Sequence, residues 1–178
     1  MNIYHEKQSK QLCALHTLNN LFQNPYAFNK SMLDDLCQQL SPSTWINPHR
    51  SMFGLGNYDI NVIMAAVSLL DYEIMWWDKR RKITTTEVDG CFGFILNLPS
   101  PSRVGGVVLP FKTKHWLAIR KLKNVFYNLD SKLETPQSIG DCQQLVHYLS
   151  NHLSEEDCEL FIVNSTKPCT LAVAEETN

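Results

Sequence analysis

The N-terminal part of the chain carries a helical pattern of leucines that begins beside a cysteine. Leucine recurs at every third position over residues 12–21, which is the apolar stripe of an amphipathic helix. The polar residues 6–11 have no such period, so we expect the helix to begin near residue 12, where Cys13 stands. A helix start offers unpaired N–H groups and the positive end of the helix dipole, and both favour a thiolate.

Two interpretations of Cys13 follow. In the first, its thiolate is a nucleophile, and the amide of Gln8, on the polar approach to the helix, donates to an oxyanion at the same place. In the second, Cys13 is a small apolar residue on the buried side of a helix, as most cysteines are. The helical pattern alone does not separate the two.

Composition narrows the class of protein. The 178 residues are 44% hydrophobic, enough for one domain with a proper core, and a net charge of −2 gives no electrostatic basis for binding nucleic acid. No apolar run approaches the roughly 18–20 residues of a membrane span, and the N-terminus lacks the apolar region of a signal peptide. We therefore expect a cytoplasmic monomer with no transmembrane segment and with its six cysteines reduced.

The remaining periodicities predict further helices and several strands. A second helix is expected from a cap at Asn29 or Ser31 to Leu40, and a fourth from about Asp141 to Leu153. A third is capped by Asp59, and its expected inward residues are Ile60, Ile63, Met64, Val67 and Leu70. Strands are expected at residues 73–77, 92–98, 115–120, 125–129 and 159–163, with a turn at residues 99–101. Residues 41–58 form a long loop in this scheme, either a substrate lip or an ordinary surface loop.

The expected hairpin brings a histidine and an aspartate together. If its connection centres on Leu122 and Lys123, His115 lies directly opposite Asp130, with Cβ atoms about 4.5–5.5 Å apart. The carboxylate then accepts the imidazole N–H, fixes the tautomer and leaves the other ring nitrogen as a base. An odd-numbered loop would place the two on opposite faces, and a pair at a strand end is also compatible with a simple surface hydrogen bond.

His16, three residues after Cys13, gives two competing interpretations. A zinc site formed with His5 and Cys13 is disfavoured, because the chain has no CxxC or HxxxH pairing, and we expect no metal and no cofactor. As a general base, His16 is a weaker candidate than His115, because the sequence shows no acidic residue to orient it. We expect it to be a neighbour on the helix face.

A cysteine at a helix start, a histidine beginning a strand about a hundred residues later and an acidic residue on the next strand resemble the triad of papain-like cysteine proteases. More specifically, the chain resembles the Josephin domain of deubiquitinating cysteine proteases. The segments that carry the resemblance are YHEKQSKQLCALHTLNNL, KHWLAIRK and FYNLDS. NPHRSMFGLGNYDINVIMAA and WWDKRRK resemble the small members that consist of little else, and the match runs from about Ile3 to Val163.

This resemblance implies an α+β, papain-like fold in which the nucleophile helix packs on an antiparallel sheet. It implies that Cys13 is the nucleophile, His115 the base and then the acid, and Asp130 the orienting residue, where a larger relative carries Asn. Gln8 and the backbone N–H of Cys13 would hold the oxyanion. Trp116 either walls the channel for a Gly-Gly tail or belongs to the core, and His16 is a second candidate for contacting substrate.

The resemblance also implies an activity and its partners. The substrates would be ubiquitin and ubiquitinated proteins, and residues 24–58 would form a short helical arm that contacts ubiquitin. We expect a catalytic domain over residues 1–164 and a polar, disordered tail over residues 165–178. Two alternatives remain open, a ubiquitin-binding module with low or latent activity and an acyltransferase that uses the same triad.

Overall fold

The computed structural model describes residues 2–9, 11–42, 47–49, 56–104 and 107–167, with the backbone alone for residues 102–104 and 107–112. The helices are α1 (Cys13–Phe22), α2 (Lys30–Leu40), α3 (Ile60–Ser68), α4 (Thr85–Val88) and α5 (Cys142–Leu153). The strands are β1 (Tyr72–Trp76), β2 (Gly93–Val104), β3 (Val107–Leu122), β4 (Val125–Asn128), β5 (Gln137–Gly140) and β6 (Glu159–Ser165). Most of the expected tail and much of the expected loop lie outside the described residues.

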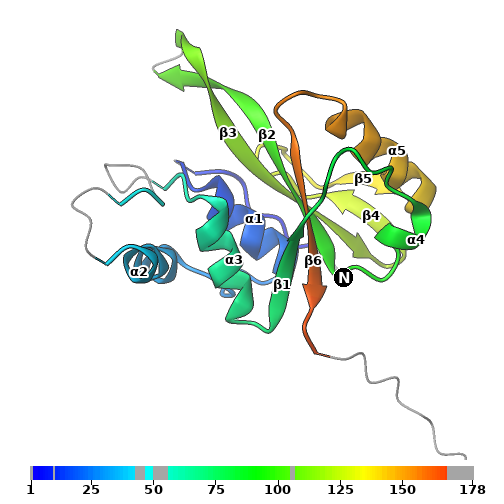
Figure 1. Ribbon diagram of the computed structural model, residues 1–178, viewed down its shortest axis with the longest axis horizontal. Coiled ribbons are helices and arrows are strands. Elements are labelled where there is room, and N and C mark those ends of the chain that lie inside the picture. Colours follow the sequence, from blue (N-terminus) through cyan, green and yellow to red (C-terminus); the bar gives the residue numbers. More distant parts are fainter. Residues whose placement is uncertain (1, 10, 43–46, 50–55, 105–106, 168–178) are drawn as a thin grey trace, which may run out of the picture.

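The strands form one antiparallel sheet in the order β1-β6-β2-β3-β4-β5, with helices on both faces. Helices α1, α2 and α3 lie on one side of the sheet, and α4 and α5 lie on the other (Figure 1). The predicted α+β domain, with the helix that begins at Cys13 packed on an antiparallel sheet, is confirmed.

The apolar strands contribute side chains to two hydrophobic cores, because successive side chains of a strand point to opposite faces of the sheet. Along β2, Ile95 packs with α1 and α3, whereas its neighbours Phe94 and Leu96 pack with α5. Along β3, Trp116 and Ala118 face the first core in the same way. A central strand that is covered on both faces has a continuous run of apolar residues in its sequence. This is why the sequence of residues 92–98 predicts a buried strand.

Side-chain caps fix three helix starts where the sequence predicts them. Asn29 accepts a hydrogen bond from Met32 N at 3.0 Å and begins α2. Asp59 and Asp141 cap α3 and α5 in the same way. Each cap satisfies backbone N–H groups that would otherwise lack a partner, so these helix boundaries were predictable from local sequence.

The inward face of α3 differs from the expected one. Ile63 and Val67 are buried as expected, but Met64 and Leu70 are 42% and 38% exposed, and Val62 and Ala66 are buried in their place. The helix also ends at Ser68, before Leu70. A helix this rich in apolar residues offers more than one possible stripe, and docking against the sheet and α2 selects one of them.

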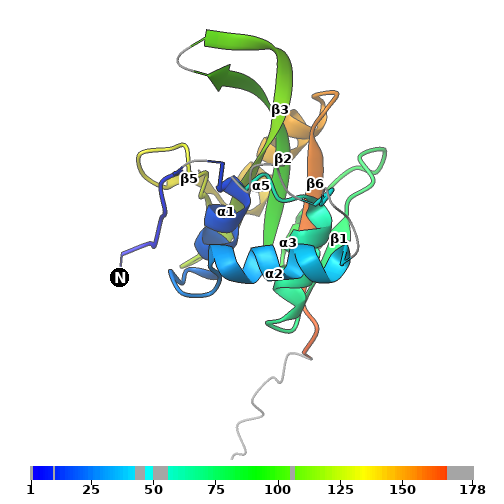
Figure 2. The ribbon, with the colours of Figure 1, turned by 90° about the vertical axis from the view of Figure 1, so that its left-hand side faces the viewer.

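The turn expected at residues 99–101 is wrong, because β2 continues through it to Val104. Pro99 pairs with Lys114, and Pro101 with Lys112, in a long hairpin with β3 that rises past the rest of the sheet (Figure 2). Strand β6 pairs with β2 only as far as Asn97. Beyond that residue β2 has one open edge, and prolines, which lack an N–H, are tolerated on strands of that kind.

The β3–β4 connection also differs from the predicted one by two residues in register. It is Lys123-Asn124, with φ of 50° and 66°, and Leu122 pairs with Val125. Positive φ at both positions is typical of a two-residue hairpin turn. The loop is still even-numbered, so His115 keeps the same face as Asp130, although the observed register, which ends at Ile119 and Asn128, would if continued place Asp130 opposite Leu117.

Two elements, α4 and β5, were not predicted, and both are only four residues long. Within the described part of the chain, no helix is long and apolar enough to cross a membrane. Of the predicted arm, the structure describes α2, which packs against α3, and the short stretches that precede and follow the undescribed parts of the loop.

Candidate active site

Helix α1 presents Cys13 at its first residue, as the leucine pattern predicts. The residue before it, Leu12, has an apolar side chain and cannot cap the helix, so the N–H groups of the first turn remain available to other acceptors. The thiol accepts hydrogen bonds from the backbone N–H of Trp116 and of Ala14. Cys13 is only 4% exposed.

The structure brings Cys13, His115 and Asp130 into contact. The imidazole Nε2 of His115 lies 2.6 Å from Asp130 Oδ1, and the thiol is hydrogen-bonded to the same ring. Because Nε2 faces the carboxylate, Nδ1 is the ring nitrogen left for the thiol. Asp130 is held in turn, since its Oδ1 accepts from Lys132 N at 2.9 Å and its N–H donates to Asn128 Oδ1 at 2.9 Å.

These contacts favour the charged forms of all three groups. Burial would raise the pKa of the Cys13 thiol, but the hydrogen bond from His115 and those from the backbone lower it below the ordinary thiol value. Burial would likewise lower the pKa of His115, but its bonds to Asp130 and Cys13 raise it. Asp130 loses water, which by itself raises the pKa of its carboxyl, yet the imidazole brings that pKa down overall. The arrangement therefore supports a thiolate–imidazolium pair.

The N-terminal segment, residues 4–9, lies along one polar face of α1, a feature that the sequence interpretation missed. Gln23 Nε2 donates to Tyr4 O at 3.0 Å, and Asn20 Oδ1 accepts from Glu6 N at 2.6 Å. Further along, Ser9 N donates to His16 Nε2 at 3.3 Å. His16, Asn20 and Gln23 recur at helical spacing on a helix that is otherwise buried, and this signal was available in the sequence.

The same segment reaches the loop that carries Asp130. Gln8 N donates to Ser131 O at 2.7 Å, and the ring of His5 contacts Asp130 O at 2.9 Å. Buried Asn20 of α1 also contacts the start of this loop, because its Nδ2 donates to Leu129 O at 3.0 Å. Gln8 thereby lies beside Cys13 and His115, at the edge of the same cleft.

The expectation that His16 lacks an acidic neighbour is wrong. Its Nδ1 lies 2.5 Å from Glu6 Oε2, and Glu6 also accepts from Asn19 Nδ2 at 3.0 Å and from the Tyr4 hydroxyl. His16 is buried and lines neither of the two clefts that reach Cys13. His5 and His16 are both engaged elsewhere. Among the described residues, no group of three His, Cys, Asp or Glu side chains is placed to hold a metal ion.

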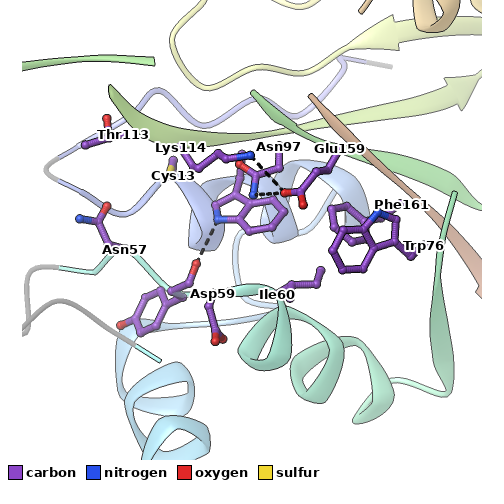
Figure 3. Close-up of a pocket in the computed structure, with 12 residues that line it drawn as sticks. Cys13, Asn57, Asp59, Ile60, Trp76, Asn97, Thr113, Lys114, Glu159 and Phe161 are labelled. Atoms are coloured by element: carbon purple, nitrogen blue, oxygen red, sulfur yellow. Dashed lines mark hydrogen bonds and ion pairs between the residues drawn. The ribbon is translucent and has the colours of Figure 1, made fainter. Parts of the chain in front are cut away.

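One cleft at Cys13, of about 460 Å³, has an apolar floor and is called here the apolar cleft. It is lined by Ile60, Trp76, Trp116 and Phe161, with Glu159 at one side (Figure 3). Trp116 belongs both to this wall and to the core, since its Nε1 donates to Tyr58 O at 3.0 Å. The two interpretations of Trp116 are therefore compatible.

A second cleft, of about 490 Å³, approaches Cys13 from the other side and is called here the polar cleft. Its lining includes Gln8, Gln11, Ser100, His115 and Lys132. Cys13, Asn57, Thr113 and Lys114 line both clefts. The sulfur therefore lies where an apolar groove and a polar groove meet, which suits the cleavage of a bond between two chemically different chains.

Comparison with known proteins shows which family this chain is similar to. The family model described as Josephin matches residues 8–164. A "Josephin-like protein" from Drosophila melanogaster is 50% identical over 162 residues, which cover 90% of this chain and 73% of the relative. "Josephin-2" from Homo sapiens is 44% identical over 161 residues, covering 90% and 85% of the two chains. "Ataxin-3" from Homo sapiens is 27% identical, and the match spans 46% of its length.

Proposed function

Because this chain belongs to the Josephin family, we propose that it is a deubiquitinating cysteine protease. Its substrates would be ubiquitin conjugates, cleaved between the C-terminal glycine of ubiquitin and a lysine amine. The observation that carries the proposal is the continuous set of contacts from Cys13 through His115 to Asp130. It joins a nucleophile, a base and an orienting carboxylate, the three roles that acyl transfer through a thiol requires.

The first half of the reaction transfers the ubiquitin acyl group to sulfur. The Cys13 thiolate attacks the glycine carbonyl, and the carbonyl oxygen takes up the negative charge. Gln8 and the N–H of Cys13 donate to that oxygen. When the tetrahedral intermediate collapses, the imidazolium of His115 gives its proton to the departing lysine nitrogen, the C–N bond breaks and a thioester remains.

The second half releases ubiquitin. Neutral His115 removes a proton from a water molecule, and the resulting hydroxide attacks the thioester carbonyl. The C–S bond breaks, the thiolate returns to Cys13, and the imidazolium regained by His115 is again stabilised by Asp130. Ubiquitin leaves as its C-terminal carboxylic acid, which gives its proton to the solvent and becomes the carboxylate. The carboxylate–imidazole contact thus serves both halves, since it holds the ring in one tautomer throughout.

The direct test is to mix the purified protein with ubiquitin that carries a C-terminal electrophile and to measure the intact mass. We expect one adduct, located by peptide mapping at Cys13. Ubiquitin that ends in a plain carboxylate is the matched control and should add nothing. An adduct at another cysteine would contradict the assigned nucleophile. With no adduct and no hydrolysis, but measurable ubiquitin binding, the protein would be a binding module. Turnover of small acyl thioesters alone would favour an acyltransferase.

A further inference from the structure

The position of His115 decides which cleft receives which half of the substrate. In the proposed reaction the imidazolium must reach the leaving nitrogen, so the leaving chain has to extend over His115. His115 and Gln8 line the polar cleft, and neither lines the apolar cleft. The acyl chain, the tail of ubiquitin, is therefore assigned to the apolar cleft. The acceptor chain, the polypeptide whose lysine carried ubiquitin, leaves through the polar cleft.

The charges that line the polar cleft are positive. Lys132 Nζ donates to Ser100 Oγ at 2.7 Å, which ties the loop after Asp130 to strand β2. Among the described residues, no carboxylate lines this cleft, although the charge of Lys132 also acts on the Asp130 carboxylate behind His115. Lys114 stands at the boundary of the two clefts, and its Nζ lies 3.3 Å from Glu159 Oε2. The apolar cleft, in contrast, is lined by Glu159, whereas the carboxylate of the neighbouring Asp59 caps α3 and pairs with His49 Nδ1 at 2.8 Å.

We propose that the polar cleft is the acceptor-binding site and that Lys132, supported by Lys114, favours acceptors with Asp or Glu beside the modified lysine. This inference rests on the proposed deubiquitinase function. Charges of opposite sign across a contact attract and those of the same sign repel, so the cleft would discriminate between acceptors by their flanking residues. The effect is one of exposed charges, so it weakens as salt is added.

The test compares ubiquitin joined through its C-terminal glycine to the lysine of two peptides, one with acidic and one with basic flanking residues. Ubiquitin amide with a small fluorogenic amine serves for normalisation. We expect kcat/KM to be about 3- to 10-fold higher for the acidic peptide at low ionic strength. Lys132→Gln should reduce that ratio towards one, and Lys132→Glu should invert it. Lys123→Glu, the same charge change in the distant β3–β4 turn, should leave the ratio intact.

The outcomes separate the two proposals. No turnover of the small amide by the natural protein would remove the deubiquitinase function itself. Turnover of the small amide with equal rates for both peptides would overturn the acceptor site alone, and so would a preference for the basic peptide. An acidic preference that survives Lys132→Glu would show that the selectivity arises elsewhere on the protein. That result also overturns the assignment.

A second inference concerns His16 and comes from a different set of contacts. The N–H of Ser9 donates to His16 Nε2 at 3.3 Å, the Ser9 hydroxyl lies at the same distance from that nitrogen, and Nδ1 faces Glu6. Ser9 follows Gln8, whose own N–H is held by Ser131 O. His16 thus fixes one end of the short segment that presents Gln8 to the cleft.

We infer that His16 is a positioning residue, which acts on the reaction by holding Ser9 and hence Gln8 in place. Displacement of an oxyanion donor lowers kcat more than it weakens substrate binding. The N–H of Ser9 requires a hydrogen-bond acceptor at the position of His16 Nε2. His16→Gln keeps an acceptor oxygen near that position, whereas His16→Asn keeps only a shorter amide on the Glu6 side.

We expect His16→Asn to lower kcat for ubiquitin amides by about tenfold with KM little changed, and His16→Gln to stay within about threefold of the natural protein. In a Gln8→Ala background, His16→Asn should cost at most about twofold more, because the two residues act as a unit. Equal losses in both backgrounds would indicate a general structural role and contradict the inference. So would equal losses for Asn and Gln. A Gln8→Ala variant with full activity would instead remove Gln8 from the mechanism.

Discussion

Replacement of Cys13 by alanine is expected to abolish hydrolysis of ubiquitin amides, with kcat falling by about 10⁴-fold or more. Without the sulfur no thioester forms, so His115 and Asp130 have no nucleophile to serve. The measurement is the release of a fluorogenic amine from the C-terminus of ubiquitin, followed at enzyme concentrations high enough to detect the residual rate. The substitution removes one buried sulfur from the start of α1.

The other cysteines provide matched controls. Burial and the nearby carboxylate of Asp89 raise the pKa of Cys91, and burial raises the pKa of Cys158 to about 11, so both stay protonated near neutral pH. Cys91→Ala is therefore expected to keep full activity, and its melting temperature can be compared with that of Cys13→Ala. Substantial hydrolysis by Cys13→Ala would show that the mechanism proceeds through a different group.

The second large effect is expected for His115→Gln, with a loss in kcat of about 10³- to 10⁴-fold. The amide has no proton to give to the leaving nitrogen and no positive charge to stabilise the thiolate. In the natural protein, the His115 contact lowers the pKa of Cys13 against the opposing effect of burial. When that contact is lost, burial is no longer opposed to the same extent, and the pKa of Cys13 should rise.

The pH dependence of thiol alkylation measures this shift directly. Iodoacetamide reacts with the thiolate, so the rate rises with pH through the pKa of the thiol. In the natural protein we expect the rate to rise at a pH below the ordinary pKa of a thiol. In His115→Gln we expect it to rise at or above that pKa. Alkylation at neutral pH should therefore slow, while the rate at high pH is largely kept. An unchanged pH profile in His115→Gln would contradict the assigned thiolate–imidazolium pair.

Asp130→Asn separates orientation from charge in the same assay. Asparagine keeps an oxygen acceptor for His115 Nε2 but removes the negative charge that raises the pKa of the imidazole. The alkaline limit of hydrolysis, where His115 loses its proton, should consequently move to lower pH. We expect the loss in rate at neutral pH to be smaller than for His115→Gln, because the ring keeps its tautomer.

Local sequence determined much of this protein. Caps at Asn29, Asp59 and Asp141 fixed three helix starts, and the leucine pattern placed Cys13 at the first residue of α1. The apolar run at residues 92–98 predicted a buried strand, and the residue types at positions 13, 115 and 130 predicted a cysteine-based site. The helix starts and the strand were predictable because caps and side-chain alternation act between residues close together in the chain.

Tertiary structure decided the remaining features, since they depend on contacts between distant parts of the chain. The N-terminal segment lies between α1 and the loop after β4, so Glu6 reaches His16 and Gln8 reaches the cleft only after folding. The inward face of α3 and the passage of β2 through its prolines follow from which neighbours are present and which are absent. The turn at Lys123 shifted the strand register by two residues, yet His115 and Asp130 still meet, because side chains along a strand return to the same face every second residue.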